Sequence, residues 1–304
     1  MSQHSLAPGQ ALFETDRLTV GVGFPLTDAR TSRPSIDREL ELATHAESVG
    51  FDALWARDVP LYWPKFGDAG QTFETWPWLA TVAARTDDIA LGTASVVLPL
   101  RHPIHVAKSA ATVDHLSEGR LVMGVATGDR DPEYDAFGID AAERGELFRE
   151  SVRWLRSLWT EEFPALDGPW GRLDGDVDLV PKPAGEIPLL PTGHARQELD
   201  WIGERGDGWL FYHLPDETLA SFLDDWREAG GEKPFAMALQ AELAADPTAD
   251  PEPIHQGYRA GIEWFREYFE QLETMGVDHV LVGLSGRDPK PALTAFGEKV
   301  LVEE

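Results

Sequence analysis

Cysteine is absent from the 304 residues, which excludes disulfide bonds, thiolate catalysis and cysteine-ligated metals. Basic residues are scarce, because 26 lysines and arginines face 53 aspartates and glutamates, a formal net charge of −27. Such a surface repels nucleic acids and anionic membranes, and neither is expected as a partner. Few lysines and many carboxylates suit a salt-rich cytoplasm, so we expect a halophilic source rather than an ordinary acidic enzyme. The six lysines are Lys65, Lys108, Lys182, Lys233, Lys290 and Lys299.

Long apolar segments are also missing. No stretch is long and apolar enough to span a bilayer, and residues 1–13 lack the basic start and apolar run of a secretory signal. We therefore expect a cytoplasmic protein. No low-complexity linker divides the chain, and a (β/α)8 core needs roughly 250 residues. These observations favour one domain over residues 1–304, with residues 1–16 as an N-terminal arm.

Short apolar runs alternate with segments of helical period, which is typical of repeated βα units. The predicted strands are 18–24, 53–56, 89–94, 121–126, 189–192, 208–212, 235–243 and 279–284. The predicted helices are 36–50, 76–85, 103–116, 148–159, 196–205, 216–229, 262–272 and 291–300. Long loops are expected at 160–186 and 246–253. Eight strands separated by helices favour a closed α/β (TIM) barrel over an open sheet.

Several local patterns do not complete a known motif. The segment from Gly21 to Leu26 lacks the third glycine of a dinucleotide fingerprint. Residues 283–287 are not a nucleophile elbow, because the glycine after the serine comes one position early. His102 and His105 share a helix face, but neither an HExxH pattern nor a carboxylate set accompanies them, so no metal site is expected. One of these histidines is better explained as a helix cap or as part of a pocket lining.

The most informative block is 89–140, which predicts a strand, an apolar connection, a helix and a second strand ending in Thr127-Gly128-Asp129-Arg130. The carboxyl ends of barrel strands face the active site. Ala94, Ser95, Thr127 and Gly128 are therefore expected to converge at one mouth. Small residues there let a flat ligand lie against the backbone, although the same residues also suit simple turns.

This block resembles the luciferase-like monooxygenase family, with the order GTA…VLP…HP…A…D.LS.GR…G…G intact. The similarity extends upstream to Gly50–Trp55 and downstream to Pro191–Arg196 and Trp201–Trp209, so that it covers roughly residues 18–284. The residues 98–103 resemble a bacterial and archaeal oxidoreductase branch rather than the light-emitting enzymes.

The resemblance implies a (β/α)8 barrel that holds reduced flavin mononucleotide (FMN) at its C-terminal mouth. By position, Ala94 and Ser95 match the family's non-prolyl cis peptide beneath the isoalloxazine ring. The residues Gly193, His194, Ala195 and Arg196, at the expected start of a helix, match a phosphate-binding turn. Backbone N–H groups and the helix dipole favour an anion there, and Arg196 can add a charge-assisted bond. Alternatively, Arg196 is a solvated first-turn arginine.

Two positions depart from the family's luciferases. Val59 stands where they have a catalytic histidine, so light emission is not expected. Thr127 matches a phosphate-contacting arginine, for which Arg130 lies close enough in sequence to substitute. Asp58 and His102 are candidate catalytic residues and Arg101 a candidate pocket group, although a helix cap, a core histidine or a salt bridge explains them equally well. Aromatic residues that either wall a pocket or simply pack are Trp55, Trp63, Trp209 and Tyr212.

The leading hypothesis is a two-component monooxygenase, in which a separate flavin reductase supplies reduced FMN that reacts with oxygen and a small organic substrate. An alternative with the same fold is hydride transfer with an 8-hydroxy-5-deazaflavin. A halophilic source favours that alternative, but the sequence offers few clustered lysines or arginines for the cofactor's polyglutamate tail. A non-catalytic flavin-binding protein and an unrelated phosphate-binding barrel are two more hypotheses, and the absence of lysine at strand ends disfavours Schiff-base chemistry in such a barrel. The family resemblance also implies a homodimer.

Overall fold

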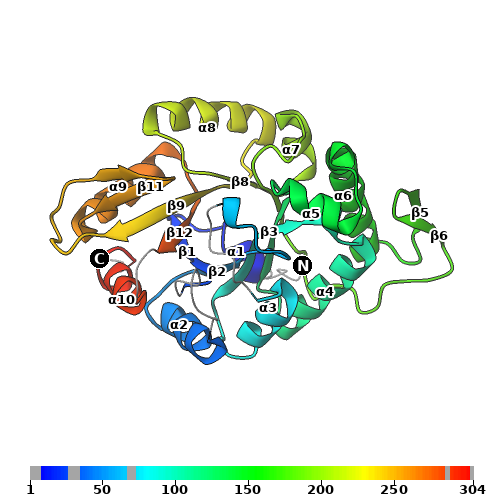
Figure 1. The fold of residues 1–304 in the computed structure, drawn as a ribbon, viewed down its shortest axis with the longest axis horizontal. Coiled ribbons are helices and arrows are strands. Elements are labelled where there is room, and N and C mark those ends of the chain that lie inside the picture. The colour runs from blue at the N-terminus through cyan, green and yellow to red at the C-terminus, as the bar shows by residue number, and fades with distance from the viewer. Residues whose placement is uncertain (1–7, 27–34, 67–72, 285–287, 302–304) are drawn as a thin grey trace, which may run out of the picture.

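The structure is a computed structural model that describes residues 8–26, 35–66, 73–284 and 288–301. Of the rejected nucleophile-elbow pattern at 283–287, residues 285–287 lie outside the described residues. All eight apolar runs form parallel strands within a ring of helices (Figure 1). The strands are β1 (Thr19–Phe24), β2 (Ala53–Ala56), β3 (Ala90–Val97), β4 (Leu121–Ala126), β7 (Leu189–Pro191), β8 (Trp209–Phe211), β9 (Phe235–Leu243) and β12 (His279–Leu284).

Strand pairing confirms the TIM-barrel fold and shows where its ladder is weakest. The order β8-β9-β12-β1-β2-β3-β4-β7 is continuous. Between β7 and β8 there is only one parallel bridge among the described residues, Thr192 to Leu210, with the Gly193 N–H donating to the Leu210 carbonyl at 2.8 Å. Strand β7 is three residues long and ends in Pro191, which has no N–H to donate. The hydrogen-bonded ladder is therefore interrupted at this place, and within the described ranges the predicted closure of the barrel is limited to this one bridge.

Eight of the helices correspond to the predicted ones. They are α2 (Ile36–Ser48), α3 (Thr75–Ala83), α4 (Pro103–Leu116), α6 (Arg144–Thr160), α7 (Leu199–Arg205), α8 (Asp216–Gly230), α9 (Ile262–Met275) and α10 (Lys290–Lys299). The prediction that a helix starts at Arg196 was wrong, because α7 begins at Leu199. Gly193, Ala195 and Arg196 have φ values of 58°, 47° and 57°, which a right-handed helix does not admit.

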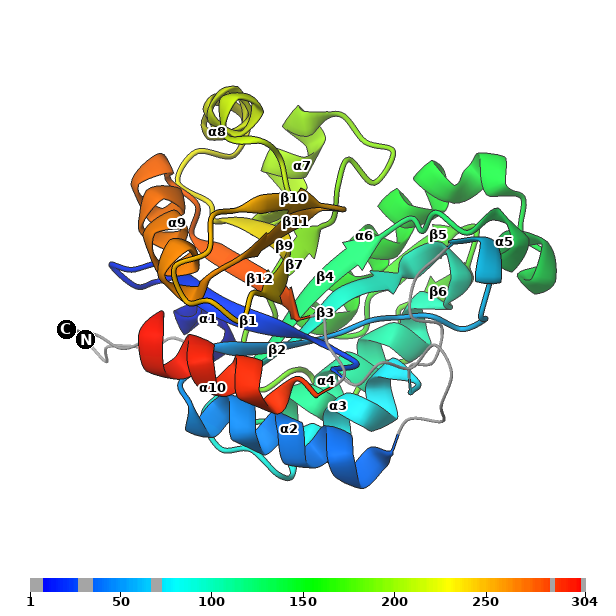
Figure 2. The same cartoon turned by 60° about the vertical axis from the view of Figure 1, so that its left-hand side comes forward.

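Additional short elements decorate the barrel. Among the described residues they are α1 (Pro8–Ala11), α5 (Asp131–Phe137) and the 3₁₀ turns η1 (Pro64–Phe66), η2 (Leu98–Leu100) and η3 (Ala141–Glu143). The expected loop at 160–186 contains the hairpin of β5 (Ala165–Gly168) and β6 (Gly171–Asp174), which projects away from the barrel (Figure 1). After the acidic loop, β10 (Glu252–Ile254) and β11 (Gly257–Ala260) extend the sheet beside the second half of β9 (Figure 2).

The barrel interior is filled from its N-terminal end by Trp55. Its indole N–H donates to His279 Nε2 at 2.9 Å, and His279 Nδ1 lies 2.7 Å from Thr19 Oγ1. A Cβ at Gly21 would lie 2.5 Å from Trp55 Nε1, and a Cβ at Gly92 would lie 2.2 Å from Trp55 Cε3. Both glycines are therefore required because the indole crosses the barrel between their strands. Trp55 is fully buried, so it packs the core and does not wall an open pocket.

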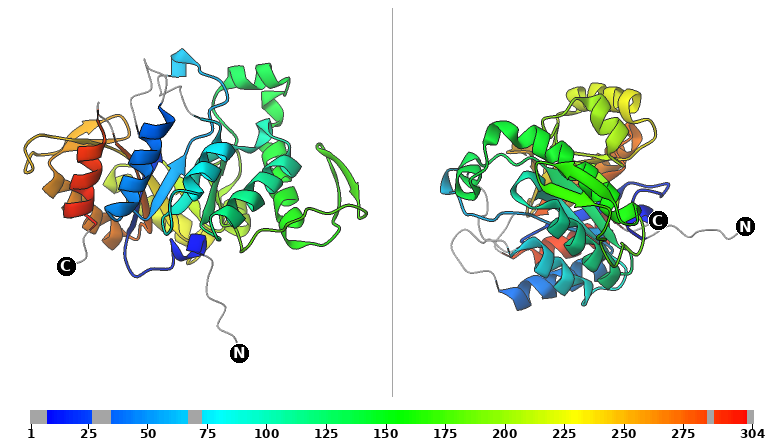
Figure 3. Two further views of the ribbon diagram at one scale, coloured as in Figure 1. Left: turned by 90° about the horizontal axis from the view of Figure 1, so that it is seen from below. Right: turned by 90° about the vertical axis from the view of Figure 1, so that its right-hand side faces the viewer.

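The N-terminal arm closes the same end. The Gly9 N–H donates to the Gly119 carbonyl at 2.8 Å, and Leu12 is buried among the interior side chains. The Phe13 ring meets His279 edge-on, with ring centroids 5.9 Å apart. Figure 3 (left) shows the arm in dark blue at the lower end, and the segments that follow β2 and β4 at the upper end. No helix in the described ranges has the length and apolar character needed to cross a bilayer.

Candidate functional site

A non-prolyl cis peptide lies between Ala94 and Ser95 in β3, as the resemblance implied. The β3–β4 register shifts between Thr93 and Val96, next to this peptide. The Ser95 hydroxyl forms a short hydrogen bond with the Thr192 hydroxyl at the end of β7. A Cβ at Gly124 would lie 2.2 Å from the Thr93 carbonyl oxygen and 3.2 Å from Ser95 Oγ. The exits of β3, β4 and β7 are therefore packed closely together.

Thr127 and Gly128 follow β4 and adjoin the exit of β3. The Tyr134 hydroxyl, which is buried, donates to the Thr127 carbonyl. Burial, and less strongly the charges of Asp129 and Glu133, raises the pKa of Tyr134 to about 12 against the lowering effect of Arg144. Gly128 has φ 79°, and a Cβ there would lie 2.7 Å from Val97 Cγ1. Gly128 thus lies against the exit of β3, and the shared binding role of Ala94, Ser95, Thr127 and Gly128 stays a prediction.

The turn from Gly193 to Arg196 is held from the side of β8. The Trp209 indole N–H donates to the Gly193 carbonyl at 2.7 Å, so Trp209 packs the wall and does not line a pocket. The His194 ring meets the edges of Trp209, Phe211 and Phe222, with centroids 5.7, 5.7 and 6.2 Å away. Ala195 is buried and Arg196 is exposed. Of the four predicted residues, Arg196 therefore offers a charged side chain to a ligand.

Three arginines surround a hollow of about 370 Å³ beside this turn. Arg149 donates through Nε and Nη2 to Gln197 Oε1 at 3.1 and 3.0 Å. Arg144 lies 3.2 Å from Asp131 and 5.6 Å above the Tyr134 ring centre. The lining residues are Ala141, Ala142, Arg144, Gly145, Glu146, Arg149 and Arg196. The expectation of too few clustered cations was wrong, because helix α6 and a turn about 50 residues later supply them jointly.

Arg130 lies elsewhere at the mouth. Its guanidinium carbon is 4.6 Å above the centre of the Phe66 ring, and its Nη1 is 3.8 Å from Glu133 Oε1. Arg130 is buried and does not line the three-arginine hollow. Its role as a phosphate contact stays a prediction, and Arg144 occupies the place next to the hollow instead.

His102 caps helix α4. Its Nδ1 accepts the Ile104 N–H at 3.3 Å, so the proton is on Nε2, which donates to the Trp170 carbonyl at 2.9 Å. The ring meets Trp154 and Trp170 edge-on. Both nitrogens are engaged between α4, α6 and the β5–β6 hairpin. These hydrogen bonds support the capping interpretation, and a catalytic role of His102 stays a prediction.

Asp58 is at the mouth and forms a salt bridge. Its carboxylate is 3% exposed and accepts two hydrogen bonds from Arg101, at 2.6 and 2.8 Å. Arg101 also lies 2.8 Å from Glu74, which caps α3. Asp58 therefore has both carboxylate oxygens occupied, which is the salt-bridge interpretation.

The sequence reasoning missed Asp129 as a residue of the mouth. Asp129 is exposed, and its charge contributes to the raised pKa values of Tyr134 and Tyr212, for both of which burial is the larger cause. Tyr212 is 39% exposed, and a Cβ at Gly193 would lie 3.3 Å from its ring. Asp129 thus lies between the ends of β4 and β8. The signal that could have identified Asp129 is its position directly after Gly128, at the end of the fourth predicted strand.

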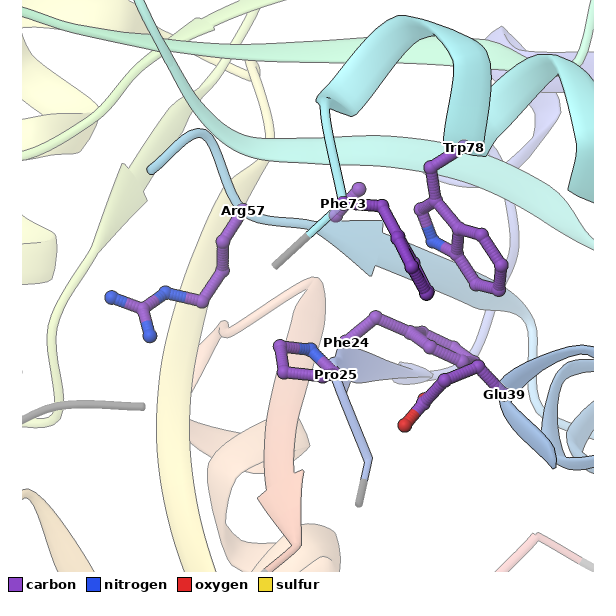
Figure 4. Close-up of a pocket in the computed structure, with 7 residues that line it drawn as sticks. Phe24, Pro25, Glu39, Arg57, Phe73 and Trp78 are labelled. Atoms are coloured by element: carbon purple, nitrogen blue, oxygen red, sulfur yellow. The ribbon is translucent and has the colours of Figure 1, made fainter. Parts of the chain in front are cut away.

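A second, much smaller hollow lies at the ends of β1 and β2 (Figure 4). Phe73 and Trp78 lie over Phe24, whereas Arg57 extends away from these rings (Figure 4). Its volume of about 20 Å³ is the space of about one water molecule and excludes a flat cofactor. Its lining residues are Phe24, Pro25, Glu39, Ala56, Arg57, Phe73 and Trp78. Among the residues that the structure describes, no group of three or more His, Asp or Glu side chains could hold a metal ion.

Together, these features define a (β/α)8 barrel with a cationic hollow at the carboxyl ends of its strands. Beside the hollow, the cis peptide Ala94–Ser95 and the Thr127–Gly128 segment form what we call the floor of the mouth. The sequence profile described as luciferase-like monooxygenase matches residues 18–292. The chain therefore belongs to the luciferase-like monooxygenase family.

Similar proteins include enzymes with two different cofactors. An F420-dependent glucose-6-phosphate dehydrogenase of Nakamurella multipartita is 28% identical over 313 residues, covering 86% of this chain and 90% of the relative. The structure of an F420-dependent secondary alcohol dehydrogenase with an F420-acetone adduct superposes with a TM-score of 0.77 and 22% identity, over 95% of this chain and 100% of the other. The FMN-bound oxygenating constituent of 3,6-diketocamphane monooxygenase from Pseudomonas putida gives 0.75 and 16%, over 94% and 98%. These relatives are oxidoreductases.

Proposed function

We propose that this protein is a deazaflavin (F420)-dependent oxidoreductase that transfers hydride between the coenzyme and a small organic substrate. The observation that carries this proposal is the hollow lined by Arg144, Arg149 and Arg196. A single phosphate would fill only a small part of about 370 Å³, whereas a phosphate with a polyglutamate tail can use several arginines. The F420-dependent relatives support the same assignment.

The residues at the mouth fit such a coenzyme. The cis peptide of Ala94–Ser95 and the Thr127–Gly128 backbone would lie beneath the flat ring, as the family resemblance implies. The Gly193–Arg196 turn would bind the phosphate, and the arginines of α6 would bind the anionic tail. The bound coenzyme would supply hydride chemistry, while the protein positions it and excludes water.

A proton must move when a hydroxyl group and a carbonyl group interconvert. Asp129 is the exposed carboxylate between β4 and β8, whereas Asp58 is occupied by Arg101 and His102 by its two hydrogen bonds. We assign proton exchange with the substrate oxygen to Asp129. The similar dehydrogenases favour a substrate with a hydroxyl-bearing carbon or its carbonyl counterpart. The Asp129→Asn variant should then bind coenzyme normally and lose turnover by roughly a hundredfold or more.

The second candidate is the two-component monooxygenase that uses reduced FMN, oxygen and a separate flavin reductase. The FMN-bound structural neighbour favours it, since the same turn could hold the FMN phosphate. With FMN bound, the remaining arginines of the hollow would have no ligand group to neutralise. The FMN hypothesis is therefore second to hydride transfer.

Fluorescence titration in high salt separates the two candidates. Wild-type protein should bind F420 more tightly than FMN and more tightly than the deazaflavin ring without its phosphate and tail. Arg149→Gln should weaken F420 binding by roughly tenfold or more and leave binding of the tail-free ring unchanged, because a charge-assisted hydrogen bond is worth about 1.5–3 kcal/mol. Arg153→Gln is the matched control, since Arg153 lies one turn further along α6 and pairs with Glu150 at 2.6 Å outside the hollow. Tighter binding of FMN would refute the deazaflavin assignment.

A further inference from the structure

The buried salt bridge of Asp58 links three segments at the barrel mouth. Asp58 Oδ1 accepts from Arg101 Nη2 at 2.6 Å, and Oδ2 accepts from Arg101 Nε at 2.8 Å. The same Oδ2 also accepts the Val97 N–H at 3.1 Å. Arg101 Nη1 lies 2.8 Å from Glu74 Oε1. The exit of β2, the exit of β3 and the start of α3 are therefore joined through one carboxylate and one guanidinium.

This arrangement does not suit proton exchange by Asp58. Burial lowers the pKa of Arg101, but the hydrogen bond and charge of Asp58, followed by Glu74, outweigh it and raise that pKa. The guanidinium thus stays charged and its planar fork occupies both oxygens of Asp58. With the Val97 N–H as a third donor, the carboxylate is engaged by the protein at both of its oxygens.

The group that Asp58 holds, Val97, is part of the floor of the mouth. Val97 is two residues after Ser95 and ends β3. Its Cγ1 is the atom that a Cβ at Gly128 would approach to 2.7 Å, so Val97 touches the Thr127–Gly128 segment directly. Val97 therefore connects the cis peptide of β3 with the glycine after β4.

We propose that Asp58 and Arg101 form a positioning pair, which fixes Val97 and through it the Ala94–Ser95 and Gly128 floor on which the coenzyme ring rests. The proposal builds on the proposed function, because it assigns a ligand to that floor. Asp58 would then act on the reaction through the backbone of β3 and not by contact with the reacting atoms.

The chain contains a matched control at the opposite end of the same strand. Asp52, which precedes β2, accepts two hydrogen bonds from Arg17, at 2.6 and 3.1 Å, and one from the Val20 N–H at 2.8 Å. Two guanidinium N–H groups and one backbone N–H thus donate here as at Asp58, although Arg17 uses Nη1 and Nη2 where Arg101 uses Nε and Nη2. These donors hold the entrance of β1, at the other end of β2 from the mouth. Asp52→Asn reports the general cost of losing such a fork, and Asp58→Asn reports that cost together with any effect on the floor.

The first measurement is backbone hydrogen exchange of the coenzyme-free protein. Asp58→Asn should speed exchange in residues 94–97 and 127–128 by roughly tenfold or more, while Asp52→Asn should speed it near Val20 and leave the mouth unchanged. Arg101→Lys, which keeps the charge but loses the planar fork, should lie between wild type and Asp58→Asn. Equal exchange at the mouth in both asparagine variants would overturn the proposal whichever coenzyme the protein binds.

The second measurement is coenzyme binding and the pH profile. Asp58→Asn should raise the F420 dissociation constant by roughly tenfold, whereas at saturating coenzyme the pH profile of turnover should keep its shape. Loss of one limb of that profile with unchanged binding would show Asp58 to be an acid or base and would overturn the positioning role. A wild-type protein that does not bind F420 would refute the proposed function, while hydrogen exchange would still decide whether the pair holds the floor.

Discussion

The buried His279 makes the stability of the barrel depend on pH, because its contacts favour the neutral imidazole. The imidazole is fully buried, and burial lowers its pKa from 6.5 to about 4, against a smaller raising effect of Asp52. The Trp55 N–H donates to Nε2, so the ring proton is on Nδ1 and faces Thr19 Oγ1. A second proton would have to enter Nε2, which already faces an N–H donor. The folded barrel therefore disfavours the imidazolium.

The sign and size of the effect follow from linkage between folding and protonation. Between pH 6.5 and about 4 the unfolded chain binds a proton at His279 that the folded chain does not, so stability falls as the pH falls through this range. A fall of the His279 pKa from 6.5 to about 4 corresponds to about 3 kcal/mol, a large part of the stability of an ordinary domain. Above pH 6.5 the contribution of this group is constant.

Urea unfolding of wild type and His279→Gln, in constant high salt at several pH values from about 7.5 to about 4, measures this contribution. Glutamine keeps an acceptor for Trp55 and a donor for Thr19 but does not titrate. The stability advantage of wild type over the variant should shrink by about 3 kcal/mol between pH of about 7.5 and about 4. An advantage that is the same at every pH would refute the assigned protonation state. The ¹⁵N chemical shifts of the imidazole provide an independent check of the Nδ1–H tautomer.

Three further predictions concern stability. Gly92→Ala places a Cβ 2.2 Å from Trp55, so urea unfolding should show a loss of about 1–3 kcal/mol, which a second change, Trp55→Leu, should partly relieve. Deletion of residues 1–16 removes the buried Leu12 from the barrel end and should lower the Tm by several degrees, as measured by circular dichroism. The buried Arg120 guanidinium donates five hydrogen bonds, four of them to backbone carbonyls. Arg120→Met should therefore lower the free energy of unfolding in urea by about 3–5 kcal/mol. A loss below about 1 kcal/mol would contradict this role of Arg120.

The strands were predictable because each is a short apolar run with clear ends. The helices of the barrel were predictable from apolar residues that recur at helical period, with the exception of the start of α7. There the sequence GHARQ carries no proline or charge pattern against a helix, and the left-handed φ of Ala195 and Arg196 follows from tertiary contacts. One such contact is the Trp209 indole, which holds the Gly193 carbonyl from the neighbouring strand.

The site was predictable only where its residues lie on consecutive strands, because such strands are neighbours in the barrel. Ala94 and Ser95 are in β3, and Thr127 and Gly128 directly follow the adjacent β4, so the expected strand order places both pairs at the same end of the barrel. Arg144 and Arg149 on α6 are about 50 residues from Arg196, and the three line one hollow because the start of α6 lies beside the turn after β7. Likewise, Asp58 and His102 were reasonable catalytic candidates by residue type, and only their hydrogen-bond partners distinguish a salt bridge and a helix cap from free functional groups.

The overall charge and the arginine hollow together predict an unusual salt dependence of coenzyme binding. An anionic coenzyme approaches a protein of net charge −27, which repels it at long range, while the arginines attract it only at short range. The Debye length falls from about 10 Å at 0.1 M salt to about 3 Å at 1 M, so added salt removes the repulsion before it weakens direct contacts. The association rate of F420, measured by stopped-flow fluorescence, should therefore rise between about 0.1 and about 1 M KCl, with a smaller change in the dissociation rate. A rate that falls steadily over this range, as for a cationic site in a basic protein, would mean that the local field of the hollow already dominates the approach.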